Sequence, residues 1–337
     1  MTQRELRLAV DIGGTFTDVA AFDEASGRLL LGKALSTPEA LVEGVEAGVA
    51  KAGTAFADAG LFLHGSTIAI NTILERTGAK TALLITEGFR DIYEIGRVNR
   101  PDSYNLFFTK HRPLVPREHR YEVHERLLAT GEILKPLDDK EIAALAETLK
   151  RERIEAVAVL FLHCYRNPSH ELRAKAILQK LLPGVFVTTS HELSQEYREF
   201  ERASTVAANA YIGPRVAHYL AEIGDHLTRG GFGGAFLVVQ STGGLFEMCQ
   251  AREQCVRMLE SGPASGVIAT QAVCRESGIA NAIAFDMGGT TAKAGVISDS
   301  HVLTTARIVC PGDWRAGWKP PAIRCCCGAK GNGTRTA

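Results

Sequence analysis

The chain has 337 residues, 45% of them hydrophobic, and its 38 basic residues balance its 38 acidic residues. This length accommodates two domains with ordinary cores, and a net charge of zero gives no electrostatic argument for nucleic acid or a membrane surface as partner. No stretch approaches membrane-spanning length, and the sequence runs directly into a predicted strand without a signal segment, so we expect a cytoplasmic enzyme. Cys164, Cys249, Cys255 and Cys274 lack metal-type spacing and are predicted to be free thiols.

A glycine-rich turn follows the first predicted strand. Residues 8–33 read LAVDIGGTFTDVAAFDEASGRLLLGK, which predicts a strand, a turn at Gly13–Thr15, a second strand, a turn at Ser26–Gly27 and a third strand. Because glycine has no Cβ, backbone N–H groups in the first turn can approach an oxyanion. Asp11 ends the first strand, where a carboxylate can hold hydrated Mg²⁺ that bridges phosphates.

The next segments predict a helix over 38–53, a buried strand over 61–67 and a helix from Thr67 to Arg76. His64, at the end of that strand, is either a residue of a ligand cleft or an ordinary strand-end histidine. A strand at 82–85 leads into a polar segment that contains three arginines. They are suited to orienting a carboxylate or phosphate, or alternatively to surface ion pairs with neighbouring acids. These arginines are Arg90, Arg97 and Arg100.

An α/β unit follows. Asp138 precedes a predicted amphipathic helix, residues 154–162 form an apolar strand typical of a sheet covered on both faces, and a helix to Leu182 leads to a strand over 185–189. The alternation predicts a layered α/β domain. The candidate metal ligands His163, Cys164 and His170 fall on different elements, which argues against a metal site.

A small-residue helix over 203–210 is predicted to be interrupted by the Gly213–Pro214 pair. Within this region Arg202, Thr205 and Asn209 are expected to act as hydrogen-bond donors that set a hinge, or alternatively as cleft residues. A strand over 236–240, a glycine-bearing turn over 241–246 and a second small-residue helix that starts near 261 complete the passage.

The first motif then recurs. Residues 282–307 read AIAFDMGGTTAKAGVISDSHVLTTAR, and alignment on the aspartates matches Asp286 to Asp11 and places Lys293 where the first copy has Asp18. One copy of such a turn is weak, because glycine turns often follow buried strands for steric reasons. Two copies in register over three predicted strands indicate the facing halves of a duplicated fold.

The two turns together predict one site for the phosphates of a nucleotide and its Mg²⁺ ion. Asp11 and Asp286 are the candidate metal ligands, and with Asp18, a weak candidate for activating water, they are the candidate catalytic residues. The candidate phosphate-binding residues are Gly13, Gly14, Thr15, Gly288, Gly289, Thr290 and Lys293.

These hairpins resemble the two phosphate loops of the actin, Hsp70 and sugar-kinase superfamily, whose domains are ribonuclease H-like. A closer resemblance, over about residues 5–309, is to the hydantoinase/oxoprolinase family, which includes N-methylhydantoinase subunits, 5-oxoprolinases and acetone or acetophenone carboxylase subunits. Five motifs carry it: DIGGTFTDV at 11–19, HGSTIAINTILER at 64–76, EGFRDIYEIGR at 87–97, YREFERASTVAANAYIGP at 197–214 and SGPASGV at 261–267.

The resemblance implies an α/β fold of two duplicated domains, with ATP and Mg²⁺ as cofactors. It implies that ATP phosphorylates a carbonyl oxygen, so that water opens a cyclic amide such as hydantoin or 5-oxoproline. The alternative is a carboxylase subunit of the acetone or acetophenone type, which would consume bicarbonate and take a ketone. The family also implies a hydantoinase B-type partner subunit. A sugar kinase or repressor fits less well, since no zinc cluster or DNA-binding helix pair precedes Asp11.

The resemblance implies a first domain over 1–190 with the first hairpin and the start of a second domain over 191–309 with the second hairpin. Residues 310–337 show neither helical nor strand periodicity and hold both tryptophans and half of the 8 cysteines. We therefore expect an atypical tail from a shifted reading frame, an incomplete second domain, and, as a third alternative for function, an inactive product.

Overall fold

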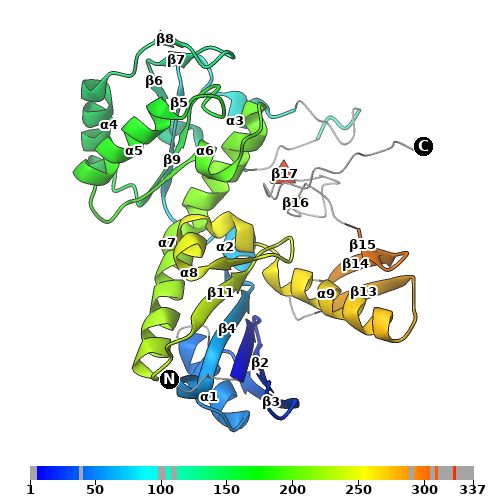
Figure 1. Cartoon of the computed structure of the whole chain (residues 1–337). Helices are drawn as coiled ribbons and strands as arrows, with labels where there is room; N and C mark the ends of the chain where they lie inside the picture. The colour runs from blue at the N-terminus through cyan, green and yellow to red at the C-terminus, as the bar shows by residue number, and fades with distance from the viewer. Residues whose placement is uncertain are drawn as a thin grey trace.

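The computed structural model describes residues 6–37, 41–97, 104–107, 112–287, 292–303, 308–309 and 322–323. Two sheets share one long helix, and a separate hairpin with its own helix lies to one side of the first sheet (Figure 1). The arrangement confirms the predicted α/β class, because strands and helices alternate and both sheets contain parallel pairs.

The first sheet has six strands in the order β12-β11-β4-β1-β2-β3. Its strands are β1 (Leu6–Ile12), β2 (Phe16–Asp23), β3 (Arg28–Leu35), β4 (Ala59–Ser66), β11 (Ala235–Val239) and β12 (Leu245–Glu247). Along β1, Leu8, Val10 and Ile12 are buried and share one core with residues of α1 (Leu41–Lys51) and α7 (Glu199–Arg229). The alternate residues, Ala9 and Asp11, face the other side of the sheet, as strand geometry requires.

The second sheet has four parallel strands in the order β10-β9-β5-β6. They are β5 (Thr81–Thr86), β6 (Arg120–Val123), β9 (Ala156–Leu160) and β10 (Phe186–Thr189). In β9, Ala158 belongs to the core shared with α7, whereas Val157 belongs to a second core with α4 (Asp139–Arg151) and α5 (Ser169–Leu181). Both faces are therefore covered, as the unbroken apolar strand predicts.

The second predicted hairpin is present as β13 (Ala282–Met287), β14 (Ala292–Ser298) and β15 (His301–Val302), preceded by α9 (Ser261–Glu276). The predicted phosphate-binding residues Gly288, Gly289 and Thr290 lie outside the described residues. The remaining helices and strands are η1 (Phe56–Asp58), α2 (Ile68–Leu74), α3 (Ile92–Ile95), η2 (Arg117–His119), β7 (Arg126–Leu127), β8 (Ile133–Lys135), α6 (Ser190–Leu193), α8 (Met248–Glu253), η3 (Cys255–Met258), β16 (Ile308–Val309) and β17 (Ala322–Ile323).

The long helix α7 corrects one prediction. Gly213 and Pro214 lie inside it and do not end it. Proline removes one intrahelical hydrogen bond, and the carbonyl oxygen of Tyr211, three residues before Pro214, accepts a hydrogen bond at 2.9 Å from the N–H of Ala79 in a neighbouring segment. Packing from both sheets thus outweighs the local helix-breaking tendency. Among the helices that the structure describes, none combines the length and the apolar character needed to cross a membrane.

Two glycines inside helices are expected to respond in opposite ways to alanine. A Cβ on Gly213 would lie 2.3 Å from the Phe186 ring, whereas a Cβ on Gly266 of α9 would meet nothing within 4 Å. Gly213→Ala should lower the free energy of unfolding by about 1–3 kcal/mol because the ring must shift. Gly266→Ala should raise it by about 0.5–1 kcal/mol because alanine favours the helix. Urea denaturation of both variants measures the difference, and equal effects would contradict this packing.

Candidate active site

Asp11 stands at the end of β1 between two glycines from distant segments. A Cβ on Gly65 would lie 3.0 Å from Oδ1 of Asp11, and a Cβ on Gly262 would lie 3.3 Å from the same oxygen. Gly65 ends the parallel neighbour β4, and Gly262 is in the first turn of α9, where backbone N–H groups lack helical partners. The absence of side chains at these glycines lets both segments approach the carboxylate.

Serine hydrogen bonds join these two segments. Ser66 donates its backbone N–H to Oγ of Ser261 at 3.1 Å, and the Ser261 hydroxyl donates to the Ser66 carbonyl oxygen at 3.0 Å. Both serines are buried. The start of α9 is therefore held against the end of β4. These two segments carry Gly262 and Gly65, which lie beside the Asp11 carboxylate.

The two hairpins have the same pairing register. Asp11 pairs across its hairpin with Asp18, and Asp286 pairs with Lys293 at the corresponding positions of the second. Burial raises the pKa of Asp11, the charges of Asp18 and Asp286 raise it further, and the charge of Lys293 opposes them. Although Asp11 retains some exposure, its carboxylate interacts with charges from both hairpins, so the fold brings the two copies of the motif to one place.

The first turn is held by hydrogen bonds to the first residue of β2 and to the residue after β3. Gly13 donates its N–H to the carbonyl oxygen of Phe16 at 2.9 Å, and the Ser36 hydroxyl donates to the Gly13 carbonyl oxygen at 2.9 Å. Gly14 and Thr15 are exposed at the tip of the turn. Because the Gly13 N–H already serves the turn, Gly14 and Thr15 are the part best placed to meet a ligand. A phosphate-binding role for all three stays a prediction.

An open cleft of about 570 Å³ runs over this face of the first sheet. Its polar end carries Asp11, Asp18 and Lys33, and Nζ of Lys33 donates to Asp18 at 2.8 Å. The rest of the wall is mostly apolar or small. These wall residues include Ala9, Ala20, Leu31, Leu63, Val239 and Ser265. The cleft therefore offers charged groups at one end and apolar surface at the other.

The carboxylates fit a loosely held Mg²⁺ ion. No three acidic, histidine or cysteine side chains gather tightly enough to enclose a metal ion in the part of the chain described here. Mg²⁺ commonly keeps several waters and is bound through one or two carboxylates and the phosphates of a substrate. Burial raises the pKa of Asp11, and the charges of Asp18 and Asp286 raise it further, as is expected where carboxylates gather beside a cation site. Asp11 and Asp286 would be the protein ligands.

His64 is buried beneath this site. One ring nitrogen lies 3.2 Å from the Val10 carbonyl oxygen, and the other lies 2.8 Å from the Tyr219 hydroxyl. Burial lowers the pKa of His64 to about 4, so the ring is neutral near pH 7. Of the two interpretations of His64, the structure supports a packed strand-end histidine that fixes β1, β4 and α7 together.

One of the three candidate arginines of the polar segment forms an ion pair. Arg97 pairs with the buried Glu201 of α7, and the neighbouring acid Asp91 accepts hydrogen bonds from Arg117 at 2.7 and 3.0 Å. Arg90 lines a separate cavity of about 340 Å³ beside α3, and Arg100 lies outside the described residues. Arg97 therefore makes an ion pair, but its partner is a buried acid of α7 and not one of the neighbouring surface acids.

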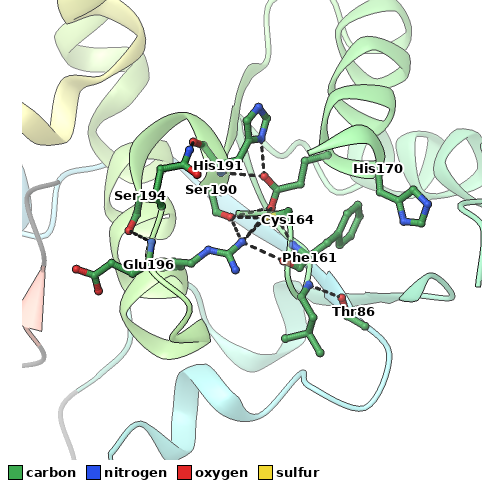
Figure 2. Close-up of polar contacts among 12 residues, drawn as sticks. Thr86, Phe161, Cys164, His170, Ser190, His191, Ser194 and Glu196 are labelled. Carbon is green, nitrogen blue, oxygen red and sulfur yellow. Dashed lines mark hydrogen bonds and ion pairs between the residues drawn. The ribbon is translucent and has the colours of Figure 1, made fainter. Parts of the chain in front are cut away.

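A buried polar cluster, which we define as Cys164, Glu171, Ser190, His191 and Arg202, lies where α7 meets the second sheet (Figure 2). Glu171 accepts hydrogen bonds from the Ser190 hydroxyl at 2.7 Å, the Cys164 thiol at 2.9 Å and the His191 backbone N–H at 2.9 Å. Arg202 lies 3.7 Å from Glu171 and donates to Cys164 and Ser190. Burial acts to raise the pKa of Glu171, but the bonds from His191 and the charge of Arg202 outweigh it and lower the pKa.

The other candidate hinge residues also make internal hydrogen bonds. Asn209 donates to the Thr188 hydroxyl at 3.0 Å and to the Glu253 carbonyl oxygen at 2.8 Å, and Thr205 donates to the Glu201 carbonyl oxygen at 2.8 Å. Both side chains are buried. Arg202 and Asn209 therefore hold α7 to its neighbours, and the Thr205 bond lies within α7 itself, so all three side chains serve as hydrogen-bond donors and do not line a cleft.

The sequence did not indicate which residues surround Asp11, namely Gly65, Gly262 and Ser261. It also did not indicate that Glu260 pairs with Lys293. The motifs HGST and SGPASG contain the first three and show an excess of small residues. That excess indicates close packing, but the contact with Asp11 depends on the tertiary fold.

Two protein-family models match this chain. A model of the hydantoinase/oxoprolinase N-terminal region matches residues 7–182, and a hydantoinase/oxoprolinase model matches residues 202–318. The first match alone covers more than half of the chain. The chain belongs to the hydantoinase/oxoprolinase family. The two matched regions also show that the repeated hairpins fall in different parts of the family architecture.

Two curated relatives and two solved structures illustrate this membership of the hydantoinase/oxoprolinase family. An uncharacterised protein, MJ0964, of Methanocaldococcus jannaschii is 41% identical over 92% of this chain and 46% of its own length. The caprolactamase alpha subunit of Pseudomonas jessenii is 36% identical over 86% of this chain and 43% of its own length. The crystal structure of that ATP-dependent caprolactamase matches with a TM-score of 0.75 and 32% identity, over 95% of this chain and 51% of the other.

A structure of acetone carboxylase, described as nucleotide-free and ATP-dependent, matches with a TM-score of 0.77 and 26% identity over 88% of this chain and 44% of the other. These matches confirm the predicted fold class. The chain spans less than half the length of the curated relatives named above. The predicted boundaries at 190 and 309 stay a prediction, and β11 and β12 from beyond residue 190 complete the sheet that β1–β4 begin.

Proposed function

We propose that this chain is the ATP-binding part of an enzyme that uses ATP to open a cyclic amide. One observation carries the proposal: Asp11 interacts with charges from both glycine-turn hairpins, although the hairpins are far apart in the sequence. A ligand with several negative charges and a bound divalent cation, such as MgATP, matches one carboxylate-bearing turn on each side. The family and its ATP-dependent structures support the same conclusion.

The residues have separate roles in this proposal. Asp11 and Asp286 hold Mg²⁺, which when bound offsets the negative charge of the phosphates. Gly13, Gly14 and Thr15 receive the phosphates on one side, and Gly288, Gly289, Thr290 and Lys293 receive them on the other. Lys293 neutralises charge that develops on the transferred phosphoryl group. Asp18, which faces the same cleft, is the candidate for orienting water.

The proposed chemistry begins with attack of the amide oxygen on the terminal phosphorus of ATP, which breaks the bond to the bridging oxygen and releases ADP. Water adds to the amide carbon, the ring C–N bond breaks and its nitrogen takes a proton. A second water then cleaves the acyl phosphate to give phosphate and a carboxylate. The protein mainly positions the phosphates and offsets their charge, as in other phosphoryl transfers. Hydantoin and 5-oxoproline are the substrates to test first.

A second candidate is an ATP-dependent carboxylase subunit, because one similar structure is an acetone carboxylase. In that case the phosphoryl group activates bicarbonate or an enolate, and turnover with a ketone consumes bicarbonate. Under either reaction we propose a hydantoinase B-type partner subunit, since the similar caprolactamase chain is named as a subunit. Dependence of phosphate release on bicarbonate or on a cyclic amide distinguishes the two.

The phosphate site is tested by Gly14→Val. A branched side chain at the exposed tip of the first turn should crowd the backbone amides and reduce MgATP affinity by at least about tenfold, because a phosphate must approach the backbone closely. Calorimetry with MgATP measures this, with Gly266→Ala as the matched control, since Gly266 faces open space. Unchanged affinity in Gly14→Val would contradict the proposed loop.

A further inference from the structure

Lys293 of the second hairpin is held by an acid from outside that hairpin. Its Nζ lies 2.7 Å from Oε2 of Glu260, with side-chain exposures of 19% and 28%. Since the pair is mostly shielded from water, its attraction is less screened than that of an exposed surface pair. The lysine proposed to meet phosphate therefore already has a carboxylate partner.

Glu260 is anchored beside the first sheet. It immediately precedes α9, its N–H donates to the Ser241 hydroxyl at 3.0 Å, and its carbonyl oxygen accepts from the Ala264 N–H at 3.0 Å. The next residue, Ser261, is bonded to Ser66 at the end of β4. The ion pair thus connects Glu260, which is held beside the first sheet, to the side chain of Lys293 on the second hairpin.

We propose that Glu260 acts as an internal competitor for Lys293, so that the phosphates of the nucleotide must displace the Glu260 carboxylate before Lys293 can bind them. This inference rests on the proposed function and adds a regulation of the same site. Glu260 and a phosphate oxygen are both anionic acceptors, and one ammonium group cannot serve both fully. Displacement would release the tie between α9 and β14, which couples phosphate binding to movement of the second hairpin.

The alternative is that Glu260 orients Lys293 toward phosphate without competing. The two roles give opposite effects when the carboxylate is removed. Competition predicts tighter phosphate binding in Glu260→Gln, and orientation predicts weaker binding. Loss of any nearby negative charge could also strengthen phosphate binding through the overall electrostatic field. Repeating Glu260→Gln in a chain that carries Lys293→Gln separates this effect from competition and from orientation.

The experiment measures binding of Mg²⁺-tripolyphosphate to the full chain by calorimetry, because this probe reports on the phosphate grip alone. Glu260→Gln should bind about fivefold tighter, the upper end for an ion pair near the surface. In the Lys293→Gln background the same change should give no gain. Glu253→Gln, on the exposed end of α8, is the matched charge control. Glu260→Asp keeps the charge but shortens its reach, and should also tighten binding.

The proposed competition is wrong if Glu260→Gln binds Mg²⁺-tripolyphosphate more weakly, or if it gains the same affinity with and without Lys293. If Glu260→Gln does not fold, Glu260→Asp decides, and unchanged or weaker binding in it overturns the inference. The proposed function fails separately: it falls if the unmodified chain binds neither MgATP nor tripolyphosphate. MgATP binding that Gly14→Val abolishes and that the Glu260 variants leave unchanged removes the competition alone.

Discussion

Asp11→Asn is expected to reduce substrate-dependent ATP hydrolysis by at least about 100-fold, the usual effect of losing one group that stabilises charge in a transition state. Asparagine keeps the shape of the side chain between Gly65 and Gly262 but cannot supply a negative charge to Mg²⁺. Phosphate release with hydantoin or 5-oxoproline measures the loss. Asp225→Asn, on the exposed side of α7, is the matched control and should keep full activity.

The same variant should be slightly more stable than the unmodified chain near pH 7. Burial and the charges of Asp18 and Asp286 raise the pKa of Asp11 in the folded state. A raised carboxyl pKa means that the ionised form costs stability above that pKa, and that the cost disappears as pH falls through it. The advantage of Asp11→Asn should therefore shrink on acidification, and it should be small because Asp11 is partly exposed.

Thermal unfolding of both chains between pH 4 and 8 follows this effect. Loss of activity together with a gain in stability is typical of a functional carboxylate held among other acids. Retained activity would remove Asp11 as a metal ligand, whereas a variant less stable at every pH would assign it a packing role instead.

Arg202→Met is expected to lower the free energy of unfolding by about 3–5 kcal/mol, the usual cost of removing one partner of a buried ion pair. Arg202 and Glu171 are both 0% exposed, so the change leaves a buried carboxylate without its cation. Urea denaturation measures the loss. Arg229→Met, at the exposed end of the same helix, is the matched control and should change stability by less than about 0.5 kcal/mol.

A double variant separates charge from packing in the buried cluster. Glu171→Gln combined with Arg202→Met removes both charges and should regain part of the stability lost in the single variant, because no uncompensated charge remains. If the double variant is no more stable than Arg202→Met, the loss comes from packing of the arginine side chain.

Repetition made much of the fold predictable. A strand, a glycine turn and two further strands recur with the same spacing, and the structure shows both hairpins with Asp11 opposite Asp18 and Asp286 opposite Lys293. The apolar run over 154–162 also predicted the burial of β9, because this pattern depends only on local geometry.

Other features depend on contacts between distant segments. The buried cluster joins residues from the segment after β9, from α5, from α6 and from α7, and no spacing in the sequence relates them. Pro214 predicted a helix end because proline disrupts a helix locally, whereas the packing that carries α7 past it comes from residues of both sheets. The seat of Asp11 was missed for the same reason, since Gly65 and Gly262 meet only in three dimensions.

The shared helix α7 has a consequence for how the molecule unfolds. Its buried residues contribute to a single core that includes Leu8 of the first sheet and Ala158 of the second. If α7 leaves either sheet, apolar surface of both sheets becomes exposed to water. The two sheets should therefore unfold together in one cooperative transition. A cut in the chain between the two sheets would then leave neither part able to fold alone.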